Sequence, residues 1–168
     1  MTVLVCAASR HGSTAEIAQA IGTVLVEHGV PVDVRPVENV TMFDGYDAVV
    51  LGSAVYMGRW LEPARRLVET EALALAARPV WLFSSGPVSD RVEREEGPVE
   101  VAAIIAATGA REHRIFGGRL LREGLGFTER AMVRALRVPD GDYRDWAVIK
   151  AWAADIATAL HNRAEVSN

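Results

Sequence analysis

The segment TVLVCAASRHGSTAE, residues 2–16, joins a short apolar run to the start of a helical pattern. Residues 2–9 form one short, mostly apolar run that is rich in valine, which is typical of a strand covered on both faces. Apolar residues then recur at helical spacing from Ile17 to Leu25, and Gly29 ends that pattern. The segment therefore predicts a strand, a loop rich in hydroxyl groups around one glycine, and a helix.

The same alternation continues along the chain. Four more strands are predicted, at 30–37, 47–53, 78–86 and 112–118. Further helices are predicted at 61–68, 99–108 and 142–160, the last capped by Asp142 or Asp145. Prolines place the second strand near an edge. This order predicts an α/β fold in which a doubly wound, five-stranded parallel sheet carries helices on both faces.

Composition limits the class of protein. The chain has 168 residues, 50% of them hydrophobic and 24% charged, which fits one globular domain over 1–168. The net charge of -4 argues against a nucleic-acid partner. One cysteine excludes an internal disulfide and a thiolate metal cage, so no metal is expected, and we interpret Cys6 as a buried apolar residue. Without a signal peptide or a long apolar run, we expect a cytoplasmic protein.

Ligands of such sheets bind beyond the carboxyl ends of the strands, where the loop 9–16 lies. Gly12 lets backbone approach a ligand, hydroxyl groups surround it, and the next helix offers unpaired N–H groups. These groups suit a phosphate monoester. No GxGxxG and no GxxxxGK pattern occurs, which argues against nucleoside triphosphate hydrolysis. An ordinary helix cap at Ser13 or Thr14 is the alternative.

Two more loops, 52–60 and 84–90, follow strands at the same predicted edge. Their small residues allow backbone amides to meet the polar edge of a flat ring, while Tyr56, Met57 and Trp60 could cover its face. Packing of Tyr56 and Trp60 over a helix end is the alternative. Together the three loops predict a binding site for a phosphorylated aromatic ligand.

The pattern S-x-x-G-S-T-x-E after the first strand resembles the phosphate loop of flavodoxins, which usually reads T-x-T-G-x-T and holds the phosphate of FMN. The resemblance covers almost the whole chain. It implies a flavodoxin-like sheet with strand order 2-1-3-4-5 and FMN as the cofactor. Within the superfamily, the chain is most similar to the menaquinone-dependent protoporphyrinogen oxidase branch, whose members act in heme biosynthesis.

The resemblance implies three groups of cofactor-binding residues. Those that would hold phosphate are Ser9, Arg10, His11, Gly12, Ser13 and Thr14. Those on one side of the flavin are Ser53, Ala54, Val55, Tyr56, Met57 and Gly58. Those on the other side are Ser84, Ser85, Gly86, Pro87 and Val88. His11 replaces the usual hydroxyl, so it is either a protonated phosphate ligand or an ordinary surface histidine.

A long excursion, at about 117–141, separates the fifth strand from the last helix. From 114 to 137 the chain has six arginines against two glutamates. Apolar residues are interleaved with them: Leu120, Leu121, Leu125, Phe127, Met132, Val133 and Leu136. Such a basic amphipathic segment suits peripheral contact with an anionic membrane, here through 117–137, or a substrate with carboxylates and an apolar body. A helix that packs on its own domain is the alternative.

The resulting hypothesis is an FMN-dependent oxidoreductase that oxidises protoporphyrinogen IX, or a related substrate, with a quinone acceptor at the inner face of the membrane. The alternatives are a one-electron flavodoxin-type shuttle, an FMN-dependent quinone reductase and a cofactor-free binding module. The chemistry would lie on FMN, and no side chain stands out as a catalytic acid or base. His113 is expected at the start of a strand, away from the ligand edge. A homodimer is compatible with the sequence.

Overall fold

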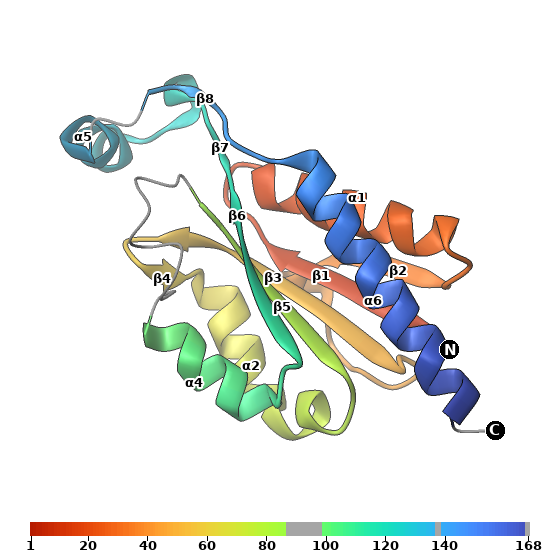
Figure 1. The fold of residues 1–168 in the computed structure, drawn as a ribbon. Coiled ribbons are helices and arrows are strands. Elements are labelled where there is room, and N and C mark those ends of the chain that lie inside the picture. The colour runs from red at the N-terminus through yellow and green to blue at the C-terminus, as the bar shows by residue number, and fades with distance from the viewer. Residues whose placement is uncertain (87–98, 137–138, 167–168) are drawn as a thin grey trace.

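The computed structural model describes residues 1–86, 99–136 and 139–166, which form a twisted sheet between two helical layers (Figure 1). Five parallel strands make up the sheet: β1 (Val3–Ala8), β2 (Val32–Pro36), β3 (Ala48–Tyr56), β5 (Val80–Gly86) and β6 (Glu112–Gly117). Their order is β2-β1-β3-β5-β6. This is the predicted order 2-1-3-4-5, because β4 (Arg59–Trp60) is only a two-residue antiparallel partner of β3.

The valine-rich β1 is buried on both faces because it lies in the middle of the sheet. Its alternate residues enter two cores, with Val5 in one and Cys6 in the other. Helices α1 (Ser13–Glu27) and α6 (Trp146–Val166) cover the first face, and α2 (Glu62–Ala76) and α4 (Val99–Thr108) cover the second (Figure 1). Cys6 is fully buried, which confirms its interpretation as a buried apolar residue, and this burial raises the pKa of its thiol to about 12.

Two local predictions concern the ends of elements. The proline-bearing strand β2 is an edge strand, as predicted. Of the two candidate caps of α6, Asp145 is correct, since its side chain accepts a hydrogen bond from Val148 N at 3.1 Å. Asp142 instead pairs with Arg144, so the helix begins later than predicted.

The excursion forms a small lobe with secondary structure of its own. It contains β7 (Arg119–Leu120), the 3-10 turn η2 (Arg122–Gly124), α5 (Phe127–Leu136) and β8 (Gly141–Asp142). β7 and β8 pair antiparallel, and Leu120, Leu125 and Val133 form a separate small core. Figure 1 shows α5 beyond the carboxyl ends of the strands, at the edge of the sheet where ligands of this fold bind.

A second 3-10 turn, η1 (Val37–Asn39), follows β2. None of the helices in the described part of the chain combines the length and the apolar composition needed to cross a bilayer.

Candidate functional site

The first loop ends in a left-handed glycine. Gly12 has φ +84°, a conformation that side chains with a Cβ rarely adopt, and it is the N-cap of α1 without a side-chain cap. A cap at Ser13 or Thr14 is therefore wrong. Gly12 N donates to Ser9 Oγ at 3.1 Å, which closes the loop. No atom lies within 4 Å of the position that a Cβ on Gly12 would take, so the backbone here borders open space.

The first turn of α1 offers donors to a ligand. Its first intrahelical hydrogen bond runs from Glu16 N to Gly12 O at 3.0 Å. The N–H groups of the three residues before Glu16 therefore have no acceptor within the helix. Ser13 Oγ accepts a hydrogen bond from Arg119 N at 2.9 Å, which leaves the proton of its hydroxyl for another acceptor. An open glycine, free N–H groups and a helix dipole together fit a phosphate monoester.

The second loop is a tight hairpin between β3 and β4. Tyr56 faces Arg59 across it, and the two residues between them, Met57 and Gly58, have φ +51° and +71°. Positive φ at both positions is the geometry of a type I′ turn, and it is uncommon for methionine. The hairpin leaves Met57 exposed at the carboxyl end of the sheet. Tyr56 joins the second loop to the first, because Arg10 Cζ lies 5.0 Å from the centre of its ring.

The predicted serines of β3 and β5 are engaged inside the protein. Ser53 Oγ accepts a hydrogen bond from Leu61 N at 2.9 Å, at the start of α2. Ser84 Oγ accepts one from Trp60 Nε1 at 2.7 Å and lies 2.8 Å from His113 Nε2. Both serines are buried, so we expect this part of the sheet to reach a ligand through its backbone. Pro87 and Val88 lie outside the described residues. Ala54 and Val55 were predicted in the loop after the strand but belong to β3 itself, because β4 pairs with this part of the chain. Ser85 and Gly86 end β5, as predicted.

Trp60 does not cover a ligand. It is 2% exposed, and its indole is held beneath the loops by Ser84, so the alternative of a packing tryptophan is correct. His113 begins β6 as predicted, yet its side chain reaches the same serine two residues further along the neighbouring strand. Burial lowers the pKa of His113, which favours a neutral ring in this hydrogen-bonded group.

The excursion contributes a carboxylate that sequence reasoning missed. Glu129 Oε1 lies 3.0 Å from Arg10 Nε and 3.2 Å from His11 Nε2, and Gly126 N donates to Oε2 at 2.8 Å. The side chain is 7% exposed. The hydrogen bond from Gly126, with those of His11 and the charge of Arg10, lowers the pKa of Glu129 although burial opposes this. A glutamate at the third position of a helix is a local signal for such a cap, but not for its contact with a distant loop.

A second group of charges fixes the base of the excursion. The Arg144 side chain is almost fully buried, pairs with Asp142 at 2.6 Å and with Glu16, and stacks over the ring of Trp146. Arg119 also pairs with Glu16, at 3.3 Å. Because Glu16 belongs to the first turn of α1, these contacts tie both ends of the excursion to the start of that helix.

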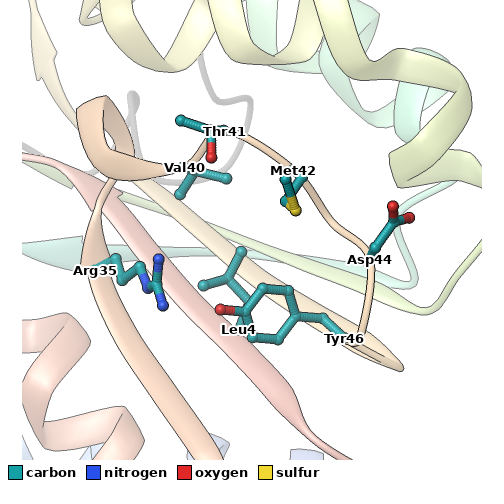
Figure 2. Close-up of a pocket in the computed structure, with 7 residues that line it drawn as sticks. All are labelled: Leu4, Arg35, Val40, Thr41, Met42, Asp44 and Tyr46. Atoms are coloured by element: carbon teal, nitrogen blue, oxygen red, sulfur yellow. The ribbon is translucent and has the colours of Figure 1, made fainter.

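A separate hollow of about 190 Å³ lies beside the edge strand β2 (Figure 2). It is lined by Leu4, Arg35, Val40, Thr41, Met42, Asp44 and Tyr46. Two of its polar side chains are engaged with a neighbour, because Asp33 accepts hydrogen bonds from Arg35 Nε at 2.6 Å and from Tyr46 Oη. None of the predicted site residues lines it, so the hollow is not part of the candidate site.

Comparison with known families agrees with this arrangement. Residues 4–146 match the model of the flavodoxin domain. The chain belongs to the flavodoxin domain family. Membership implies FMN as the cofactor. The open space at Gly12 and the N–H groups that precede the first intrahelical hydrogen bond of α1 are compatible with a phosphate group.

Individual relatives are similar to this protein over nearly its whole length. Protoporphyrinogen IX dehydrogenase (quinone) of Escherichia coli strain K12 is 24% identical over 172 residues, which cover 94% of this chain and 95% of that protein. A flavodoxin from the domain Archaea has a TM-score of 0.66 at 18% identity, covering 96% of this chain and 99% of its own. A mutant flavodoxin from Pseudomonas aeruginosa has a TM-score of 0.62 at 16% identity, with the same coverage. The two solved structures confirm the fold.

Proposed function

We propose that this member of the flavodoxin family is an FMN-dependent oxidoreductase that oxidises protoporphyrinogen IX, or a related substrate, and reduces a quinone such as menaquinone. The observation that carries the proposal is the contact of Glu129 with Arg10 and His11, because it holds the excursion against the phosphate loop. A simple electron carrier needs a docking face, whereas a lobe held beside the cofactor suits a substrate site. The quinone-dependent relative, similar over nearly its full length, supports the same assignment.

The surface of the excursion supports this choice of substrate class. Phe127 is 90% exposed and Leu121 54% exposed, so apolar area lies open on the excursion. Arg134 is exposed on the same helix as Phe127. A porphyrinogen has an apolar macrocycle and carboxylate arms, which fits apolar side chains mixed with arginines. We extend the proposal to peripheral contact of 117–137 with the inner face of the membrane, where a quinone would be reached.

The arrangement of the site suggests what the cofactor and the protein would each contribute to the reaction. Bound FMN would supply the redox chemistry by accepting reducing equivalents and passing them on. The backbone of Gly12 and of the first turn of α1 would hold its phosphate. The carboxyl ends of β3 and β5 would line the ring on its two sides, and Tyr56 with Met57 would shape the edge open to substrate.

The test is an anaerobic titration of the purified protein with FMN followed by absorption spectroscopy. We expect bound flavin to bleach with protoporphyrinogen IX and to recover its absorption with a menaquinone analogue. Flavin that binds but ignores protoporphyrinogen would contradict the enzyme proposal and favour an electron shuttle. Flavin reduced only by a nicotinamide and reoxidised by quinone would favour a quinone reductase. Failure to bind FMN would leave a cofactor-free binding module.

A further inference from the structure

Glu129 occupies an unusual place for a carboxylate, since it lies against a loop built to bind an anion. One of its oxygens, Oε1, contacts both Arg10 Nε and His11 Nε2, at 3.0 and 3.2 Å. The other is fixed by the N–H of Gly126 at 2.8 Å. With 7% of the side chain exposed, this carboxylate is shielded from water, and its depressed pKa keeps it ionised.

The positive charge of the loop 9–16 is thus partly neutralised by Glu129 before any ligand binds. Arg10 carries the permanent positive charge of the loop 9–16, and Glu129 offsets it at contact distance. Glu16, the acid in the first turn of α1, is itself paired with Arg119 and Arg144. A phosphate dianion that enters the loop must therefore share Arg10 and His11 with Glu129.

Two effects of Glu129 on a phosphate have opposite signs. It restrains Arg10 and His11, which saves side-chain entropy when a ligand binds. Glu129 also neutralises Arg10 and repels the phosphate. This repulsion is strong because the phosphate dianion carries two negative charges and the site is partly buried. Restraint of Arg10 does not depend on Glu129 alone, because the guanidinium also stacks on Tyr56. The electrostatic effect therefore dominates.

We propose that Glu129 is an internal competitor for the phosphate loop, which determines how strongly the protein prefers a phosphate monoester over the same ligand without phosphate. This inference rests on the proposed function only in taking FMN as the ligand. Glu129 acts through Arg10 and His11. Because coupling is reciprocal, a phosphate in the loop also weakens the contact that holds α5.

The test compares FMN with riboflavin, which lacks the phosphate, by flavin fluorescence on the apoprotein. In Glu129→Gln, which keeps the shape of the side chain, we expect FMN to bind about tenfold more tightly. Riboflavin affinity should stay unchanged. Glu123→Gln is the matched control, since it removes the same charge from an exposed site of the same lobe and should leave both affinities near their original values.

A double-mutant cycle locates the effect. If Glu129 acts by occupying Arg10, the gain from Glu129→Gln should shrink in an Arg10→Gln background, where FMN itself binds more weakly. Weaker FMN binding in Glu129→Gln would overturn the proposal in favour of pure positioning. Equal changes for FMN and riboflavin would overturn it in favour of a structural role, and no change at all would overturn it too.

Inorganic phosphate separates this inference from the proposed function. Its affinity for the apoprotein, measured by phosphorus NMR, should rise in Glu129→Gln whether or not the flavin ring binds. A rise without FMN binding would support the internal competitor and contradict the flavoenzyme. If the protein binds FMN but Glu129→Gln changes neither the FMN affinity nor the phosphate affinity, the internal competitor is contradicted and the flavoenzyme is supported.

Discussion

At the scale of single residues, the proposed role of loop 9–16 in holding phosphate depends on the backbone of Gly12. Its φ of +84° places the chain in the left-handed region, and the space beside it is open. A side chain there would cost about 1–2 kcal/mol of backbone strain and would fill the space that a phosphate needs. The two costs can be separated, because Gly29 at the other end of α1 has φ +77° and the same open surroundings.

We therefore expect Gly12→Val to abolish FMN binding, whereas Gly29→Val keeps it with a similar loss of stability of about 1–2 kcal/mol. Isothermal titration with FMN and urea denaturation of both variants measure the two effects. Unchanged FMN affinity in Gly12→Val would remove this loop from the cofactor site. Loss of FMN binding in both variants would mean that α1 as a whole, rather than Gly12, had been disturbed.

The lowered pKa of Asp142 predicts how the stability of the protein depends on pH. Hydrogen bonds from Arg144 lower its pKa from 3.8 to about 2. Because the folded-state pKa is the lower one, the ion pair stabilises the protein fully above about pH 4, and this contribution disappears as the pH falls toward 2. In Asp142→Asn, urea denaturation should show a smaller loss of stability across this interval. Asp44→Asn, at an exposed loop carboxyl, should keep the original slope, and equal slopes in all three proteins would contradict the role of Asp142.

At the scale of elements, α5 is amphipathic, with Val133 in its small core and Phe127 90% exposed. If porphyrinogen covers Phe127, Phe127→Ser should raise the KM for this substrate about tenfold, from the lost apolar contact. FMN affinity should not change. Leu73→Ser on α2 is the control, since Leu73 is 89% exposed on an element outside the excursion. Steady-state kinetics that leave the KM of Phe127→Ser unaltered would place the substrate elsewhere.

The turn between β3 and β4 shows how local and tertiary effects combine in one element. The sequence predicts a strand ending at 53, but β3 continues to Tyr56 because β4 folds back and pairs with it. That pairing places Tyr56 beside Arg10 and buries Trp60. A hairpin with methionine and glycine in the turn lacks the usual Asn-Gly signal, so propensity alone did not reveal it.

At the scale of the whole molecule, a cluster of three aromatic rings joins the centre of the sheet to α6. Phe83 lies 6.0 Å from Phe116 and 6.3 Å from Trp152, measured between ring centres. Gly52 makes room for this arrangement, because a Cβ there would lie 2.1 Å from the ring of Phe83. The tight contact couples two central strands to the helical layer.

Gly52→Ala should therefore lower the free energy of unfolding by about 1–3 kcal/mol through overpacking. Thermal and urea denaturation measure this loss. In a Phe83→Leu background the same change should cost less, since the smaller side chain vacates part of the space. Equal costs in both backgrounds would show that the ring of Phe83 is not what excludes a side chain at position 52.

The sequence by itself determined the alternation of strands and helices along the chain, the edge position of β2 and the hydroxyl-rich loop around Gly12. Each follows from neighbouring residues: the valine-rich run of β1, the prolines of β2, and the hydroxyl groups around Gly12. Periodicity and local chemistry are enough for such features, because the groups involved are adjacent in the chain.

Only the tertiary structure decided what touches the loop. Glu129 meets His11 across 118 positions and Arg144 meets Glu16 across 128, through the path of an excursion that no local pattern specifies. The same holds for Trp60, which the sequence offered as a ligand cover but which is buried and donates a hydrogen bond to Ser84. Charges and aromatic rings are used in many ways in proteins, and which use is realised depends on the partners that the fold brings within contact distance.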